Sequence, residues 1–214
     1  EEIRAMPETS YEAPVRRNGY VTFGSFNNFA KVTDEILLLW RGILESVRGA
    51  KLVIKGKIAS IDSGLHFAKK RLSILNYDLT RVEFRPFSPD YLEQYRDIDI
   101  ALDTAPYNGG LTTCEALYMG VPVIALRGRT HGARFGASIL TNAGVRELVA
   151  ENDINYVRRA VQLAESPKLI DGYHAGLRTS MKKSPLMDIQ GYMNALEAAY
   201  EEIWKKFCAV QSSS

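Results

Sequence analysis

The sequence predicts an α/β protein with a Rossmann-like parallel sheet and helices on both faces. Short apolar segments typical of buried strands alternate with segments in which apolar residues recur every three or four positions, as on one face of a helix. Polar and glycine-rich residues follow the strands, whereas the returns from helix to strand are bland. This alternation favours a chain of βαβ units.

The first half of the chain should contain three strand–helix units. Helical spacing is clearest after the first strand, where Asp34 is suited to the first turn and Ile36, Leu37 and Trp40 begin the apolar face. Ser88 as N-cap and Pro89 at the first position would start the third helix. We expect strands over 20–27, 51–56 and 81–87, and helices over 34–48, 62–76 and 88–97.

The second half should continue the sheet and then become entirely helical. We expect strands over 97–106, 121–128 and 147–150, and helices over 111–120, 132–144 and 153–165. The last helix of the chain carries one apolar stripe, made by Met193, Leu196, Tyr200, Ile203 and Phe207. The domain organisation that follows is a linker over 1–18 arriving from an absent upstream region, a Rossmann-like lobe over 19–167, and a helical extension over 168–210 that packs on the lobe.

Composition limits the classes of partner and compartment. Acidic and basic residues are interspersed and leave a net charge of +2, so we expect no nucleic-acid and no membrane partner. No apolar run approaches the roughly 20 residues that span a bilayer. Two cysteines, Cys114 and Cys208, argue against a disulfide framework and fit the reducing cytoplasm. Histidines and cysteines show no metal-ligand spacing, so we expect no metal and no other cofactor.

Residues suited to binding a ligand gather after the expected strands. In an open parallel sheet these positions share one edge, and ligands bind there, near the point where the strand order reverses. After the first strand come Asn27, Asn28 and Lys31; after the third, Phe87, Ser88 and Tyr91; after the fourth, Thr104, Tyr107, Asn108, Gly109, Gly110, Leu111, Thr112 and Thr113; after the fifth, Arg127, Arg129, Thr130, His131 and Arg134.

The stretch after the fourth strand predicts a site for a nucleoside diphosphate. Gly109 and Gly110 let the backbone approach a ligand closely. Thr112 and Thr113 lie where a helix begins, and free amides and the helix dipole there favour an anion. Glu115 is suited to a ribose diol, because a carboxylate accepts from both hydroxyls. Lys31 would supply the cation that a diphosphate needs.

A purely structural interpretation of the same stretch is also open. Asn108-Gly109-Gly110 is an ordinary turn sequence. The threonines could only cap the helix, with Glu115 completing a capping box. The functional interpretation rests on the convergence of separate signals on one edge of the sheet.

Four segments resemble the C-terminal catalytic lobe of the O-GlcNAc transferase and SPINDLY group, glycosyltransferase family 41. They are FGSFNNFAKVTDEILLLWRGIL, DIALDTAPYNGGLTTCEALYMGVPVIALRG, HGARFGASIL and SPL…YMNALEAAYEEIW, and the resemblance covers about residues 19–207. The resemblance implies a GT-B architecture of two Rossmann-like lobes, with the nucleotide-sugar bound mainly by the second. It also implies inverting, metal-independent transfer from a UDP-sugar, commonly UDP-GlcNAc, to serine or threonine hydroxyls of proteins.

The resemblance assigns roles to individual residues. Asn28 and Lys31 match positions that meet the diphosphate, and Lys31 is the one residue to which it gives a catalytic role. Thr112 and Thr113 match the phosphate-binding helix start, and Glu115 matches the acidic residue that holds the ribose. The segment around Phe87 and Ser88 matches the part that lines uracil, and the final helix matches one that crosses back to the first lobe.

Two residues depart from the family pattern, and much of the family's enzyme lies outside this chain. Tyr91 stands where a histidine beside the nucleotide is usual, and Leu111 stands where bacterial members commonly have a third threonine. The first catalytic lobe, which contributes the catalytic histidine and acceptor contacts, and upstream tetratricopeptide repeats are expected as partners. This chain alone should be inactive, and its exposed lobe face could drive self-association.

Other functions remain open. The lobe could belong to a transferase for another UDP-hexose, to a nucleotide-sugar epimerase, or to a catalytically silent module that binds a nucleotide-sugar or docks a protein. A receiver or flavodoxin-like signalling domain needs acidic residues after the first strands, but Asn27-Asn28 and Lys55-Lys57 stand there.

Overall fold

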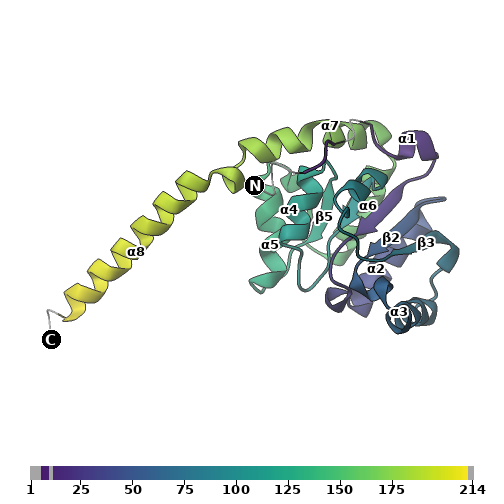
Figure 1. The fold of residues 1–214 in the computed structure, drawn as a ribbon, viewed down its shortest axis with the longest axis horizontal. Helices are drawn as coiled ribbons and strands as arrows, with labels where there is room; N and C mark the ends of the chain where they lie inside the picture. Colours follow the sequence, from purple (N-terminus) through teal and green to yellow (C-terminus); the bar gives the residue numbers. More distant parts are fainter. Residues whose placement is uncertain (1–5, 10–11, 212–214) are drawn as a thin grey trace.

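A computed structural model describes residues 6–9 and 12–211, and it contains one six-stranded, fully parallel sheet (Figure 1). The strand order is β3-β2-β1-β4-β5-β6. The strands are β1 (Thr22–Ser25), β2 (Lys51–Lys55), β3 (Val82–Arg85), β4 (Ile100–Leu102), β5 (Val123–Leu126) and β6 (Val149–Ala150). The predicted fold class, an α/β parallel sheet wrapped by helices, is confirmed.

The α-helices connect these strands and then extend the chain. They are α1 (Val15–Asn18), α2 (Asp34–Ser46), α3 (Asp62–Ile74), α4 (Leu111–Tyr118), α5 (Phe135–Asn142), α6 (Asp153–Ala164), α7 (Pro167–Lys183) and α8 (Ile189–Gln211). Short 3₁₀ helices cover Phe29–Lys31, Lys57–Ser60, Leu79–Arg81, Glu93–Asp97, Gly132–Arg134, Arg146–Leu148 and Pro185–Met187. Because parallel crossovers are right-handed, helices formed before and after the reversal of strand order lie on opposite faces.

The start of α2 illustrates how the sequence sets these elements. Thr33 is the N-cap, and its hydroxyl accepts a hydrogen bond from the Ile36 amide at 3.3 Å. The helix then buries one apolar face, on which Trp40 is completely enclosed. The Trp40 indole donates a hydrogen bond to the Tyr156 hydroxyl at 3.0 Å, and this bond joins α2 to α6.

The strand order reverses between β1 and β4. Phe23 of β1 is in register with Leu52 of β2 on one side and with Ile100 of β4 on the other. The chain leaves these two central strands in opposite directions, so the loops that follow them diverge and open a crevice at the carboxyl edge. Gly24 permits this central packing, because a Cβ there would lie 2.8 Å from Ile98 Cδ1.

The predicted α-helix over 88–97 is wrong. Turns follow Ser88, and a 3₁₀ helix covers Glu93–Asp97. The Ser88 hydroxyl does not cap a helix, because it accepts hydrogen bonds from Lys55 Nζ at 3.0 Å and Gln94 Nε2 at 2.9 Å. Tyr95 stacks on Phe26 with ring centroids 4.2 Å apart. These tertiary contacts outweigh the weak helical preference of a ten-residue segment.

The amino-terminal edge of the sheet is held by helix α7 and by the segment that precedes β1. Asp99 accepts hydrogen bonds from the amides of Val15 and Thr22, each at 2.7 Å. Asp171 of α7 accepts from the Ala13 amide at 3.0 Å and pairs with Arg16 at 2.6 Å. Part of the segment expected as a linker is thus held against the lobe.

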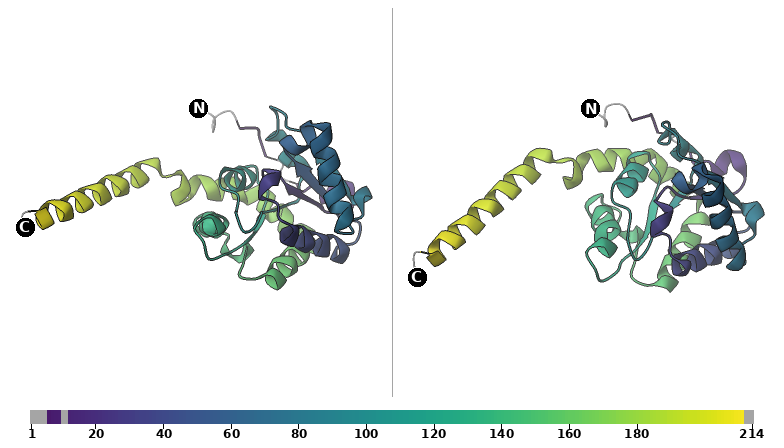
Figure 2. Two further views of the ribbon diagram at one scale, coloured as in Figure 1. Left: turned by 90° about the horizontal axis from the view of Figure 1, so that it is seen from below. Right: turned by 60° about the horizontal axis from the view of Figure 1, so that its bottom comes forward.

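Helix α8 projects away from the lobe, whereas α7 packs along it (Figures 1 and 2). Both views in Figure 2 show α8 as an arm beyond the end of α7. Its large apolar side chains are therefore exposed, among them Tyr200, Ile203 and Trp204.

Candidate functional site

The loops after β1 and β4 meet at the reversal of strand order, and Lys31 joins them. Lys31 lies at the end of the 3₁₀ helix Phe29–Lys31, and its ammonium donates to the Asn108 carbonyl at 3.2 Å. The same ammonium lies 4.4 Å from the centroid of the Tyr107 ring. The structure thus holds a half-exposed positive charge at the crevice. Asn28, beside it, is exposed and its side chain caps the 3₁₀ helix by accepting from the Ala30 amide at 3.1 Å.

Gly109 brings the loop after β4 into close contact with the start of α4. A Cβ at Gly109 would lie 2.5 Å from Thr113 Oγ1 and 2.7 Å from Thr112 Oγ1. The space around the Gly110 Cα is open, with no atom within 4 Å of a Cβ built there. Thr112 is fixed by donating to Asn27 Oδ1 at 2.9 Å. Since α4 begins at Leu111, its first amides and a threonine hydroxyl lie beside an open, glycine-lined space.

Asp103 supports this loop from inside the protein, and the sequence analysis missed it. Its Oδ1 accepts from the Gly109 amide at 2.7 Å and the Thr104 amide at 2.8 Å. Burial raises the pKa of Asp103 to about 7, against the opposing effect of these amides and of Lys31. The available signal was an acidic residue placed directly after the apolar strand β4.

Buried polar atoms line a small void behind the loop. Ser25 Oγ, Asp103 Oδ2 and Thr113 Oγ1 have no hydrogen-bond partner in the described part of the chain. The void has a volume of about 10 Å³, close to the space that one water molecule needs. These three atoms come from β1, the end of β4 and α4, so the crevice has a polar floor.

Glu115 and Tyr91 form a pair on the side of α4. The Tyr91 hydroxyl donates to Glu115 Oε1 at 2.5 Å, although the carboxylate is almost completely buried. Tyr95 fixes the same region by donating to the Thr112 carbonyl at 3.3 Å. Tyr91, which departs from the pattern of the family that the sequence resembles, is therefore hydrogen-bonded to the carboxylate expected to hold a ribose.

The loop after β3 presents an aromatic ring above a buried lysine. Phe87 is 56% exposed, and its ring faces that of Tyr91 at 6.5 Å with an interplanar angle of 28°. Below it, Lys55 donates to the Pro86 carbonyl at 2.6 Å and to Ser88. Burial lowers the pKa of Lys55. The exposed ring suits the face of a planar base.

The structure places most of the predicted site residues on the segments that follow β1, β3 and β4, with different roles for some side chains. The Asn108 side chain is fully buried and donates to the Thr104 carbonyl at 2.7 Å, so only its backbone carbonyl reaches Lys31. Leu111 is 73% exposed and contributes its position at the start of α4. Phe87 and Ser88 join the site through Tyr91 and its bond to Glu115.

The described part of the chain has neither a cluster of metal-ligating side chains nor a membrane-spanning helix. Over 6–9 and 12–211, no three histidine, cysteine, aspartate or glutamate side chains are grouped as metal ligands would be. None of the helices in that part of the chain combines the length and apolar character required to cross a membrane.

Comparison with known proteins identifies relatives of this lobe. Residues 5–196 match the family described as Glycosyl transferase family 41. The chain is 41% identical over 198 residues to the probable UDP-N-acetylglucosamine–peptide N-acetylglucosaminyltransferase SPINDLY of Eustoma exaltatum subsp. russellianum, and 40% identical over 198 residues to that of Arabidopsis thaliana. Each match covers 91% of this chain and 22% of the relative, so the chain spans about a fifth of the length of these proteins.

Solved structures show the same architecture. A mutant O-GlcNAc transferase from Thermobaculum terrenum is similar with a TM-score of 0.80 and 32% identity, over 92% of this chain and 38% of that one. Anabaena HepE in complex with UDP and glucose gives a TM-score of 0.64 at 15% identity, over 92% of this chain and 55% of that one, which shows a shared fold only.

Proposed function

The chain belongs to glycosyltransferase family 41, and we propose that it is the C-terminal, donor-binding lobe of a protein O-glycosyltransferase. The transferase would be inverting and metal-independent, and would move a sugar, GlcNAc first among them, from UDP to serine or threonine hydroxyls. The observation that carries the proposal is the convergence of Lys31 and the glycine-lined start of α4 at one crevice. The names of the 40% identical relatives support UDP-GlcNAc as donor.

We assign the diphosphate to the space between Lys31 and the first turn of α4. A cation, free amides at a helix start and the Thr112 and Thr113 segment all favour two linked phosphates. The ribose would lie toward Glu115, which Tyr91 orients, and the uracil toward Phe87 and the backbone at Ser88. A simple anion would use only the groups assigned to the diphosphate, and it would leave Glu115 and Phe87 without a ligand.

The proposed role of the lobe in catalysis is electrostatic. When the acceptor hydroxyl attacks the anomeric carbon, the bond to UDP breaks and negative charge develops on the departing diphosphate. In this proposal, Lys31 and the amides at the start of α4 stabilise that charge as preorganised donors. Loss of one such preorganised donor lowers turnover by about 100- to 1,000-fold, which is the effect we expect for Lys31→Ala in the complete enzyme.

The rest of the enzyme must lie outside this lobe. The relatives are roughly four times as long as this chain, because the same match covers 91% of the chain and 22% of the relative, and we propose that the upstream part of the parent protein supplies the first lobe, the general base, acceptor contacts and tetratricopeptide repeats. Cys114 is a free cysteine, which fits an enzyme of the cytoplasm.

A second candidate is a lobe for another UDP-hexose or a silent nucleotide-sugar-binding module. The hydrogen bond from Tyr91 to Glu115 supports this second candidate. The bond occupies one oxygen of the carboxylate expected to hold the ribose. Donor selectivity separates the two transferases, and turnover of the complete protein separates both from the silent module.

Calorimetric titration of this chain with UDP, UDP-GlcNAc, UDP-glucose and GDP tests the proposal. We expect UDP and UDP-GlcNAc to bind in preference to GDP, and Lys31→Ala to abolish binding without unfolding the chain. Lys69→Ala, an exposed lysine on α3 away from the crevice, is the matched control. Equal binding of UDP and GDP, or undiminished UDP binding by Lys31→Ala, would contradict the assignment.

A further inference from the structure

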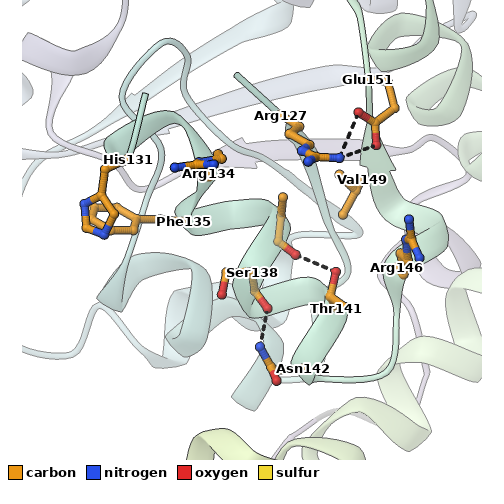
Figure 3. Close-up of a pocket in the computed structure, with 11 residues that line it drawn as sticks. Arg127, His131, Arg134, Phe135, Ser138, Thr141, Asn142, Arg146, Val149 and Glu151 are labelled. Carbon is orange, nitrogen blue, oxygen red and sulfur yellow. Dashed lines mark hydrogen bonds and ion pairs between the residues drawn. The ribbon is translucent and has the colours of Figure 1, made fainter. Parts of the chain in front are cut away.

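A cleft with three arginines in its lining lies against α5 (Figure 3). It has a volume of about 510 Å³ and is bounded by α5, β6 and the segment after β5. Arg127 follows β5, Arg134 ends the 3₁₀ helix before α5, and Arg146 begins the 3₁₀ helix before β6. Three different segments therefore contribute arginines to the lining of one cleft.

The positive charge of the cleft is poorly neutralised. Glu151 is the one carboxylate among the residues that line it, and it meets Arg127 at 3.4 Å, with both side chains about half exposed. In the described part of the chain, Arg134 and Arg146 have no carboxylate within ion-pair distance. An exposed pair such as Arg127–Glu151 contributes little stability, so an incoming anion can replace it.

Side-chain contacts link one wall of the cleft to Lys31. Phe135 lines the cleft and meets Tyr107 edge to face, with centroids 6.1 Å apart and planes at 83°. The Tyr107 ring in turn lies under the Lys31 ammonium at 4.4 Å. The ring centroid of His131 lies 4.8 Å from that of Phe135. Tyr107, Phe135 and His131 together form an aromatic rim on the cleft. A peptide that passes the donor site toward α5 would cross this aromatic rim and reach the arginines.

We propose that this cleft binds an acidic segment of the acceptor protein next to the hydroxyl that receives the sugar. The proposal rests on the proposed function, because it extends the path of the acceptor from that donor site. Guanidinium groups on three elements suit carboxylates or phosphoryl groups spaced along an extended chain better than one small ion. The only aromatic rings that line the cleft are His131 and Phe135, already packed on each other, so bases have little to stack on.

Fluorescence anisotropy of labelled peptides with this 214-residue chain tests the proposal. The probes are a serine peptide flanked by glutamates, the same peptide with phosphoserines replacing the glutamates, and a neutral version with glutamines. We expect either anionic peptide or both to bind, and the neutral one not to bind. Binding of the phosphorylated peptide alone would identify phosphoryl groups as the anion recognised.

Arg134→Gln/Arg146→Gln should weaken the binding of the anionic peptide by about tenfold or more. The matched control, Arg48→Gln/Arg158→Gln, removes two exposed arginines outside the cleft and should leave binding unchanged. Absence of binding, or equal loss in both variants, overturns the proposal. Tighter arginine-dependent binding of oligothymidylate than of the peptides would overturn it in favour of a nucleic-acid site.

Titration of the same samples with UDP separates this proposal from the one on which it rests. UDP binding that persists in Arg134→Gln/Arg146→Gln, with peptide binding lost, supports both. UDP binding without peptide binding refutes the acidic-segment proposal alone. Peptide binding without UDP binding refutes the donor-site assignment and with it the acceptor role of the cleft, and leaves only a site for anionic peptides.

Discussion

At the scale of the residue, the adjacent Gly109 and Gly110 differ in the space available for a side chain. A methyl group at Gly109 would overlap the hydroxyls of Thr113 and Thr112, at 2.5 and 2.7 Å, whereas Gly110 has free space and a φ of −111°. We expect Gly109→Ala to destabilise the chain by about 1–3 kcal/mol through overpacking and to weaken UDP binding. Gly110→Ala should leave the thermal transition unchanged.

Thermal denaturation followed by circular dichroism measures the difference between the two alanine variants. Equal melting temperatures would show that the contact between Gly109 and the two threonines does not constrain the loop.

The site residues that could be predicted from sequence are those that follow a strand and carry a group known to bind phosphate. Lys31 and the Thr112-Thr113 pair follow strands and carry groups that bind phosphate, so their positions predicted the crevice. The buried orientation of Asn108 could not be predicted, because it depends on the Thr104 carbonyl and the Gly136 amide, which only the fold brings together. Asp103 was missed because its role is to hold a backbone amide six residues away.

At the scale of the element, α6 is tied to the loop that forms the site. The Tyr156 hydroxyl of α6 accepts from the Trp40 indole at 3.0 Å and donates to the Asp103 carbonyl at 2.9 Å, and all of these groups are buried. Tyr156→Phe leaves both partners without a hydrogen bond, so we expect a loss of about 1–3 kcal/mol in the free energy of unfolding.

Tyr173→Phe is the matched control, because the Tyr173 hydroxyl donates to Glu147 at 2.8 Å in an exposed position. Its removal should change stability by less than about 0.5 kcal/mol. Urea denaturation measures both variants. A Tyr156→Phe chain as stable as Tyr173→Phe would mean that the buried network contributes nothing beyond packing.

The elements that could be predicted were those with a strong local pattern. Helix α2 combines a threonine cap, early acids and a regular apolar face, and its start was placed correctly at Asp34. The segment 88–97 has a plausible cap but little periodicity, so contacts of Ser88 and Tyr95 with other elements decide its structure. Local signals specify an element only where tertiary contacts do not compete with them.

At the scale of the whole molecule, two buried carboxyl groups make stability depend on pH. Burial raises the pKa of Asp99 to about 6 and that of Asp103 to about 7, whereas an unfolded chain titrates them near 4. Between these values the folded chain holds more protons than the unfolded chain. The contribution of these groups to the free energy of unfolding therefore falls as pH rises from about 4 to about 7.

Buried His174 opposes this trend, because burial lowers its pKa and its contribution grows as pH rises. The informative quantity is therefore the difference between the native chain and Asp103→Asn. We expect the melting temperature of the native chain relative to Asp103→Asn to decline from pH 5 to pH 8. A difference that stays constant over this range would show that Asp103 is ionised throughout.

Helix α8 carries an exposed apolar stripe. Its 23 residues extend about 35 Å, and Tyr192, Tyr200, Ile203, Trp204 and Phe207 are each more than half exposed. Spacings of three and four residues place most of these side chains on one stripe, and an apolar stripe of this size favours association. We therefore expect the chain to self-associate through α8 at high concentration.

Ile203→Ser/Phe207→Ser should shift the chain toward the monomer, because it removes two members of the stripe. The melting temperature should not change, since neither side chain belongs to the buried core. Glu202→Ser/Lys206→Ser removes an exposed ion pair of 2.6 Å on the same helix and should leave association unchanged. Light scattering over a concentration series measures the mass of each variant. A native chain that is monomeric at every concentration would contradict self-association through α8.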